Sequence, residues 1–348
     1  MILANIGRAP DTVKACAIVV WRDDALRYPR VIKSGGENMD ELTIAIATSG
    51  LTRDLKEGRV DTGGLRLDHI EISPITQAMR RMVRGLEFDI SEMAITTYLC
   101  ARVHSKPITA IPVFVTRNFH HGAIFRADGS DIREPKDLEG RTVGINRGYT
   151  VTTGIWARGI LASEYGVNLG SITWAATDDE HVAEFAAPAN VDYSNQGTSI
   201  TDLIAGGAVE AGVGAFPAGA TGIERLIPDP LAAGAAYYEK TGVYPINHTI
   251  VVKNAVLDAH PEVAQTLFQA FKASKDAYLA SLDAKTDLEP FDETALALAE
   301  IVGDPYPFGV APNRKALETV IDFAADQGVI ADRFAVDDLF ARGTADLT

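Results

Sequence analysis

The chain has 348 residues, a length that fits two domains, and 47% of them are hydrophobic, which excludes disorder over most of its length. Its 32 basic and 47 acidic residues give a net charge of −15, so a nucleic-acid or anionic membrane surface would repel it. Two cysteines, Cys16 and Cys100, are too few for a disulfide framework or a cysteine metal site. We therefore expect no nucleic-acid partner and no membrane partner.

Residues 1–38 differ from the rest of the chain and end in a turn-rich stretch just before Met39. Their short apolar segment has no basic segment ahead of it and is followed by charges, so they do not resemble a secretory signal. No apolar run reaches about 18 residues, the length of a transmembrane helix. We therefore predict a cytoplasmic protein with an N-terminal extension. The extension is either peripheral, with Met39 as a real or alternative start, or an arm that joins copies of the chain in a homo-oligomer.

Strands and helices alternate from residue 42 onward, which indicates a mostly parallel sheet. The helix expected over residues 74–85 places Met79, Met82 and Val83 on one side, as a helix covering a sheet requires. The strands predicted in this part are 42–47, 70–72, 108–115 and 121–126, and the helices are 74–85 and 95–103.

The stretch 133–167 is a strand–loop–helix unit. A β-branched strand over 141–145 is followed by a polar loop over 146–150 and a helix over 152–165. The loop of such a unit faces the ligand in open α/β sheets, and free N–H groups at a helix N-terminus favour an anion. We therefore expect an anion-binding loop here.

The same alternation continues to about residue 252, after which the chain is mostly helical. Further strands are predicted over 171–175, 211–215 and 249–252, helices over 200–206 and 232–241, and a proline-rich loop over 217–230. The predicted fold class is α/β, with two doubly wound lobes joined by a hinge of two crossings and a ligand site between them. The predicted domains are an N-terminal extension (1–38), a first lobe (39–120 and 247–348) and a second lobe (121–246).

Five blocks of sequence, taken together, resemble the 4,5-dihydroxyphthalate decarboxylase family, whose fold is similar to that of type 2 periplasmic solute-binding proteins. The resemblance covers roughly residues 42–340 and implies a decarboxylase of a hydroxylated aromatic carboxylic acid that needs no cofactor. The chain departs from the family at His120, where relatives carry an arginine, and at Arg147-Gly148, so the ring substituents of its substrate are expected to differ. The blocks are FDISEMAITTYL (88–99), AIPVFVTRNFHHGAIF (110–125), REPKDLEGRTVGINRGYTVTTGIWARGILASEYGV (133–167), YPINHTIVV (244–252) and YPFGVAPNRKALE (306–318).

Two histidines are the candidate catalytic residues. His121 matches the histidine of the family and lies where the chain enters the second lobe, and His248 lies where it returns. Histidine suits acid or base catalysis because its unperturbed pKa is near the working pH. We expect the two side chains to meet across the cleft, one as acid and one as base. The alternative for each is a structural histidine that is hydrogen-bonded within the protein.

The remaining candidates are residues expected to bind the substrate. Arginine suits a carboxylate because its guanidinium donates a forked pair of hydrogen bonds. Arg117 lies at the C-terminal end of a predicted strand, and Glu92 is expected either to orient a histidine or an arginine or to cap a helix. The predicted substrate-binding residues are Arg53, Glu92, Thr96, Arg117, Arg147, Tyr149, Thr150 and Asn247.

We predict no metal site and no cofactor. Asp178, Asp179, His181 and Glu184 have a carboxylate–histidine pattern, but an acidic helix start produces the same pattern. The predicted partner is a small aromatic carboxylate. The alternative function is a solute-binding protein of the transporter type for an aromatic or heterocyclic acid, and a third is another lyase on the same scaffold. The alternative requires an export signal, which we do not find, and two histidines in the site are more than a binder needs.

Overall fold

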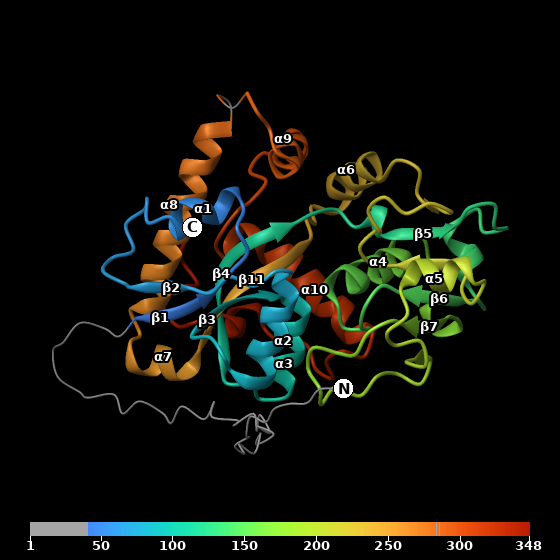
Figure 1. Cartoon of the computed structure of the whole chain (residues 1–348), viewed down its shortest axis with the longest axis horizontal. Coiled ribbons are helices and arrows are strands. Elements are labelled where there is room, and N and C mark those ends of the chain that lie inside the picture. The colour runs from blue at the N-terminus through green and yellow to red at the C-terminus, as the bar shows by residue number, and fades with distance from the viewer. Residues whose placement is uncertain (1–40, 283, 285) are drawn as a thin grey trace, which may run out of the picture. The chain divides into compact units, whose positions relative to one another are not determined.

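The computed structural model describes residues 41–282, 284 and 286–348, which belong to one compact unit (Figure 1). The predicted N-terminal extension, residues 1–38, lies outside the described residues. Within the described part, two separate β-sheets hold the strands, and both carry helices. We refer to the two sheets with their attached segments as lobe 1 and lobe 2.

Lobe 1 is built on a five-stranded sheet in the order β2-β1-β3-β11-β4. Strands β1, β2 and β3 are parallel, whereas β11 is antiparallel to both β3 and β4. The second strand lies earlier in the chain than predicted: β2 covers Leu67–His69, and the prediction is 70–72. The strands are β1 (Leu42–Ala45), β2 (Leu67–His69), β3 (Ile90–Ala94), β4 (Ile108–Arg117) and β11 (Ile246–Lys253).

Most helices of lobe 1 bury one side in its core. Helix α2 shows why: Met79, Met82 and Val83 form the predicted apolar side and are all buried, while its arginines stay at the surface. The helices are α1 (Gly50–Lys56), α2 (Ile75–Gly85), α3 (Ile95–Val103), α7 (Asn254–Ala259), α8 (Val263–Leu282), α9 (Pro290–Val302) and α10 (Arg314–Asp326), with 3₁₀ turns η4 (Ala311–Asn313) and η5 (Val336–Leu339).

Lobe 2 is built on a six-stranded sheet in the order β10-β5-β9-β6-β7-β8. Strands β6 to β9 are parallel, and β5 is antiparallel to β9 and β10. The strands are β5 (Ile124–Ala127), β6 (Thr142–Ile145), β7 (Thr173–Ala176), β8 (Val191–Asp192), β9 (Ala211–Val213) and β10 (Ile223–Arg225). The helical elements are α4 (Thr152–Ser163), α5 (Ile200–Ala205), α6 (Pro230–Thr241), and 3₁₀ turns η1 (His121–Ala123), η2 (Pro135–Leu138) and η3 (Leu169–Ser171).

Two expectations for lobe 2 are corrected. The strand expected over 121–126 begins only at Ile124, because the chain first makes the 3₁₀ turn η1. The segment 217–230, expected to be loop, contains the short strand β10. The predicted strand–loop–helix unit is confirmed, with β6 and α4 on either side of residues 146–151.

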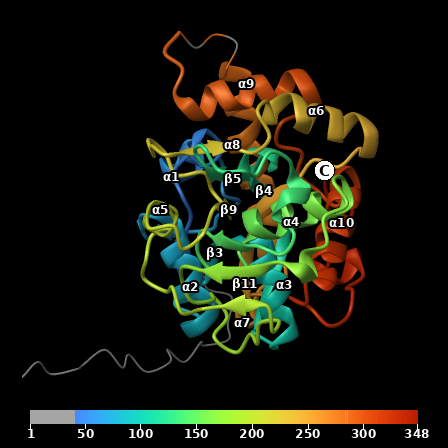
Figure 2. The ribbon, with the colours of Figure 1, turned by 90° about the vertical axis from the view of Figure 1, so that its right-hand side faces the viewer.

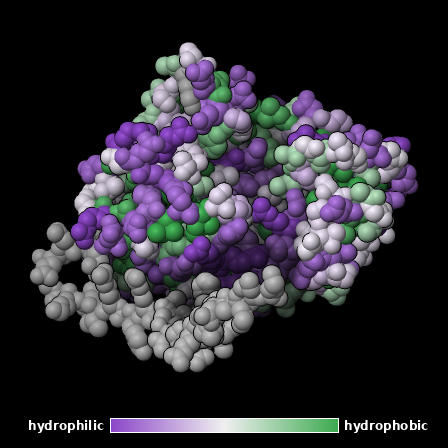
Figure 3. Space-filling model, viewed as in Figure 1, coloured by the Kyte–Doolittle hydropathy of each residue, from purple (hydrophilic) through white to green (hydrophobic). Residues whose placement is uncertain are grey.

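Helix α10 packs against α4, so the C-terminal part of the chain also reaches lobe 2 (Figures 1 and 2). Gly159 of α4 permits this approach, because a Cβ atom there would lie 2.0 Å from the ring of Phe323. At the end of α10, Gln327 accepts from Arg158 Nε at 2.7 Å and donates to the carbonyl of Ile155 at 2.9 Å. Hydrophilic residues gather in the hollowed middle of the face drawn in Figure 3.

Candidate functional site

A cavity of about 520 Å³ lies beside the two strands that cross between the lobes. At this crossing Ile246 of β11 pairs with Arg117 of β4, and His248 pairs with Thr116. One step along β4 therefore corresponds to two steps along β11. This is a β-bulge in which Asn247 is the extra residue of β11. Such a bulge interrupts the strict alternation of side chains along the strand. The cavity lining combines apolar walls with a few polar groups: Phe119, Phe216, Leu231, Phe291, His120, Thr153, Arg225 and Asn247.

Arg225 brings a positive charge to the wall of this cavity. Its guanidinium carbon lies 4.4 Å from the ring centroid of Phe216, which holds the side chain in place. Among the described residues, no carboxylate forms an ion pair with it. Sequence reasoning missed Arg225 because it lies in the segment expected to be a loop. Nothing in its neighbours signals a site, and only β10 pairing with β5 brings it to the cavity.

His120 lies on the floor of the same cavity and is buried. Its Nε2 lies 2.9 Å from Asn247 Oδ1, and its ring stacks on Trp156 with centroids 6.3 Å apart. Because an amide oxygen only accepts, Nε2 carries the proton and Nδ1 is left as an acceptor. Burial lowers the pKa of His120 to about 3, while its hydrogen bond with Asn247 acts in the opposite direction. His120 is therefore neutral at ordinary pH and serves as a hydrogen-bonding group.

His121, the predicted partner of His248, lies elsewhere. Its side chain is fully buried, with Nε2 at 2.9 Å from Glu164 Oε2 and the ring edge against Tyr237. It does not line the cavity, whereas its neighbour His120 does. The reason is local: β4 ends at Arg117 and the chain turns into η1 at residue 121, which sends the two adjacent side chains in different directions. The expected meeting of His121 and His248 across the cleft is not present in this structure.

His248 is oriented by Glu92. Nδ1 of His248 lies 2.6 Å from Glu92 Oε1, and the other carboxylate oxygen accepts the N–H of Ala47 at 2.9 Å. A carboxylate only accepts, so Nδ1 carries a proton and Nε2 is the nitrogen available to a ligand. In the described part of the chain, no hydrogen-bond partner contacts Nε2. Glu92 is only 2% exposed and His248 19%, so the pair lies at the edge of the interior with one ring nitrogen free. This arrangement suits proton transfer.

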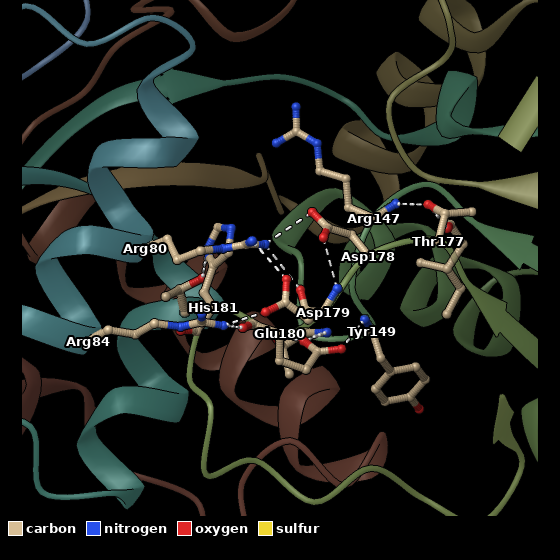
Figure 4. Close-up of polar contacts among 12 residues, drawn as sticks. Arg80, Arg84, Arg147, Tyr149, Thr177, Asp178, Asp179, Glu180 and His181 are labelled. Carbon is tan, nitrogen blue, oxygen red and sulfur yellow. Dashed lines mark hydrogen bonds and ion pairs between the residues drawn. The ribbon is translucent and has the colours of Figure 1, made fainter. Parts of the chain in front are cut away.

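The predicted anion-binding loop exists, but an anion of the chain itself occupies it. The Glu180 carboxylate accepts the N–H of Tyr149 at 2.5 Å and the N–H of Thr150 at 2.9 Å (Figure 4). It also accepts the hydroxyls of Thr150 at 2.5 Å and Tyr193 at 2.6 Å. A Cβ at Gly148 would lie 2.9 Å from the same carboxylate, so this loop closes tightly on Glu180. The N–H groups of Tyr149 and Thr150 therefore already have an acceptor within the protein, and contact of these two residues with the substrate stays a prediction.

Arg147 is the residue of this loop that stays available. Its backbone has φ of 90°, and its N–H donates to Thr177 Oγ1 at 2.8 Å. The side chain points away from the Asp178–His181 segment in Figure 4, and among the described residues no acceptor is recorded for its guanidinium. Its neighbour Asn146 donates to the carbonyl of Ala215 at 2.7 Å, and Ala215 lines the cavity. Arg147 is thus next to a residue that contacts the cavity wall, and it does not itself line the cavity.

The polar groups of three further candidates contact other residues of the protein. Arg117 is buried, and its three nitrogens donate to the carbonyls of Pro245 and Tyr244 and to Asn313 Oδ1. Burial lowers the pKa of Arg117 to about 10. Arg117 also lines the cavity, and these contacts use three of its five N–H donors, so its role as a carboxylate clamp stays a prediction.

Thr96 and Arg53 likewise have protein partners. Thr96 Oγ1 donates to the carbonyl of Thr150 at 2.6 Å and so joins α3 to the loop before α4. Arg53 forms an exposed ion pair with Glu289 at 3.1 Å. The polar groups of Thr96 and Arg53 are therefore already paired within the protein.

The acidic segment after β7 forms no helix and holds no metal-ligand cluster. Asp178 and Asp179 pair with Arg80 and Arg84, and Glu184 pairs with Lys106 at 2.6 Å. Over the residues that the structure describes, no group of three or more His, Cys, Asp or Glu side chains is placed to hold a metal ion. In the same part of the chain, no helix is long and apolar enough to cross a membrane.

Two characterised enzymes resemble the chain in sequence, and no family model matches it. The 4,5-dihydroxyphthalate decarboxylase of Comamonas testosteroni is 27% identical over 318 residues, which cover 86% of this chain and 96% of that protein. The 4,5-dihydroxyphthalate decarboxylase of Pseudomonas putida is 25% identical over 214 residues, 58% of this chain and 82% of that protein.

Solved structures show the fold. The periplasmic aliphatic sulphonate-binding protein SsuA from Escherichia coli superposes with a TM-score of 0.53 at 12% identity, covering 87% of this chain and 92% of that one. The desulfurization enzyme DSZB gives a TM-score of 0.50 at 16% identity, covering 88% and 98%. The predicted α/β fold with two lobes of the periplasmic-binding-protein type is confirmed. That fold serves both a binding protein and an enzyme, so it does not choose between the two functions.

Proposed function

The chain belongs to the 4,5-dihydroxyphthalate decarboxylase family, and on this basis we propose that it removes a carboxylate from a hydroxylated aromatic acid without a cofactor. The observation that carries the proposal is the contact between Glu92 and His248. A buried carboxylate that orients a partly exposed imidazole, with the second ring nitrogen free, is an arrangement for moving a proton. A protein that only binds its ligand has no need of it.

The reaction requires one proton at the carbon that loses its carboxylate. A ring hydroxyl para to this carboxylate pushes electron density toward that carbon. His248 then delivers a proton from Nε2, a C–H bond forms, and the C–C bond to the carboxylate breaks. The electron pair of that bond returns to the ring, CO2 leaves, and His248 regains a proton from water. Glu92 holds the imidazole in the correct orientation by accepting a hydrogen bond from Nδ1.

The cavity supplies groups for the rest of such a substrate. Arg225, which lines the cavity, and Arg147, which lies outside its lining, have no carboxylate partner among the described residues, and they hold the carboxylates of an aromatic diacid. Phe216 and Phe291 pack against the ring. His120 accepts a hydrogen bond from a ring hydroxyl at Nδ1, because its pKa of about 3 makes it an acceptor and not a proton carrier. Asn247 lines the cavity, whereas His248, the next residue of β11, lies outside its lining, so the substrate has to extend past Asn247 to reach Nε2 of His248.

The experiment is a measurement of CO2 release from 4,5-dihydroxyphthalate and from related hydroxylated benzoic acids. We expect turnover with at least one of these acids, and we expect His248→Asn to lower turnover far more than binding. The competing function is non-catalytic binding, which the fold permits equally well. Micromolar binding of these acids with no turnover of any of them would establish that function instead.

A further inference from the structure

Two arginines of α2 in lobe 1 reach across to the segment that follows β7 in lobe 2 (Figure 4). Arg80 contacts Asp178 at 3.0 Å and Asp179 at 2.7 Å, and Arg84 contacts Asp179 at 2.6 Å. Arg84 also donates to the carbonyl of Glu180 at 2.5 Å and to that of His181 at 3.1 Å. Each guanidinium therefore uses several donors, which fixes its orientation as well as its distance.

The same segment holds the loop that carries Arg147. Thr177 accepts the N–H of Arg147, and the Glu180 carboxylate accepts the next two loop N–H groups, those of Tyr149 and Thr150. Residues 177–181 thus contact α2 on one side and the loop 147–150 on the other. A movement of α2 relative to lobe 2 would pull on the segment that sets the position of Arg147.

His181 adds a second contact between the lobes. Its Nδ1 lies 3.1 Å from Thr97 Oγ1 of α3, and both residues are buried. Burial, together with the nearby Arg80, lowers the pKa of His181 to about 4, so the imidazole adds no positive charge beside the two arginines. The acidic residues of the segment thus face the arginines of α2 without a competing cation from His181.

We propose that Arg80 and Arg84 form a latch with Asp178 and Asp179 that holds the lobes closed and positions Arg147. They are positioning residues, since they act through residues 177–181 and do not line the cavity. The role of Arg147 as the group that they position depends on the proposed function. The latch itself does not depend on the proposed function, because its ion pairs join α2 to residues 178 and 179 whatever the cavity binds.

The exposure of the latch makes it reversible. The four side chains are between 30% and 47% exposed, so each ion pair is weak and screened by salt. A latch of this strength closes the lobes over a ligand and still releases the product. Its loss raises the apparent dissociation constant of a ligand by about threefold to tenfold, because a smaller fraction of the protein is closed.

The test compares the distance between the lobes in four variants. Spin labels at Glu57→Cys of lobe 1 and Asp128→Cys of lobe 2, both exposed, report the distance in a Cys16→Ser background. The variants are Arg80→Ala with Arg84→Ala, the matched control Arg81→Ala, Arg84→Asp, and Arg84→Asp with Asp179→Arg. Arg81 lies on the same helix but pairs with Glu87 within lobe 1, so the control removes a charge without touching the contact between lobes.

We expect longer and broader distances in the Arg80→Ala, Arg84→Ala variant and in Arg84→Asp. We expect unchanged distances in Arg81→Ala and a return toward the native distance in the charge-swapped pair. In the native protein, raising the salt concentration to 1 M lengthens the distance. Equal distances in the double variant and in Arg81→Ala would overturn the latch.

A second measurement separates the latch from the proposed function. For 4,5-dihydroxyphthalate or another acid that turns over, the double variant should show a raised KM with kcat changed less than twofold. If no acid turns over, the proposed function fails while the distances still decide the latch. If the distances change but KM does not, the latch exists and the positioning of Arg147 is overturned.

Discussion

Glu92 and His248 are diagonal neighbours across the antiparallel pair of β3 and β11. Glu92 lies opposite Ile250, and His248 lies opposite Ala94, so the two side chains share a face of the sheet and meet at 2.6 Å. A rigid sheet therefore sets their distance. The first two predictions follow from this geometry.

Glu92→Gln removes the carboxylate that accepts from Nδ1 of His248 and keeps the shape of the side chain. We expect kcat to fall by about 100-fold, the lower range for loss of assisted proton transfer, and KM to change less than threefold. Steady-state CO2 release measures both constants. Glu57→Gln, which neutralises an exposed carboxylate of lobe 1, is the control and should leave both unchanged. A similar loss in KM and kcat would indicate that Glu92 supports folding of the site and not the chemistry.

His248→Asn and His120→Asn should have different effects, although both histidines adjoin the crossing. We expect His248→Asn to lower kcat by about 100-fold or more, because it removes the proton donor. We expect His120→Asn to weaken binding of hydroxylated acids by about tenfold through loss of one hydrogen bond, and to leave binding of phthalate itself unchanged. Calorimetric titration with hydroxylated and unsubstituted acids measures the difference. Equal weakening for both kinds of acid would show that His120 does not recognise the hydroxyl.

Arg225→Gln should weaken binding of an aromatic carboxylate by about 10- to 100-fold, the range for one charge-assisted contact. Stability should hardly change, since Arg225 is exposed and has no ion pair with a described residue. Arg133→Gln is the matched control, because Arg133 is also an exposed arginine of lobe 2 and does not line the cavity. Calorimetric titration measures both variants. If Arg225→Gln binds as tightly as Arg133→Gln, the carboxylate lies elsewhere.

Much of the fold was predictable from the sequence, because local patterns determine it. The apolar side of α2 and the β6–loop–α4 unit are read from residues close together in the chain. The site was less predictable, because contacts between distant residues decide it. Glu180 lies about 30 positions beyond the loop that it fills, and no local pattern of the loop indicates this. A shift of one residue, where β4 gives way to η1, placed His120 and not His121 in the cavity.

Acid should destabilise the protein through its buried neutral histidines. The pKa of His181 is lowered from 6.5 to about 4 by burial and by nearby arginines. Between these values the unfolded chain binds a proton that the folded chain does not, so stability falls as the pH drops from 6.5 to about 4. His181→Gln removes this proton and should flatten the pH dependence of the free energy of unfolding in that window. Urea unfolding at several pH values measures it, with His260→Gln, a histidine at the surface of lobe 1, as the control. Parallel curves for His181→Gln and the native protein would contradict the prediction.

Glu180→Ala should uncover the anion site that the sequence predicts before α4. The N–H groups of Tyr149 and Thr150 lose their acceptor, and each unsatisfied donor costs about 1–3 kcal/mol. A sulfate ion can replace the carboxylate, because it would meet the same N–H groups at a helix N-terminus beside the buried Arg158. We therefore expect sulfate to raise the melting temperature of Glu180→Ala more than sodium chloride does at equal ionic strength.

Two controls separate this effect from general salt stabilisation. The native protein, whose loop already holds a carboxylate, should respond equally to both salts. Glu184→Ala removes an exposed carboxylate from the same segment, one that pairs with Lys106 and not with the loop, and should behave like the native protein. A sulfate response in all three proteins would mean that sulfate acts by exclusion from the protein surface. A response in Glu180→Ala alone would show that the loop binds anions and that Glu180 normally occupies it, which leaves Arg147 as the group of this loop that is free to contact a substrate.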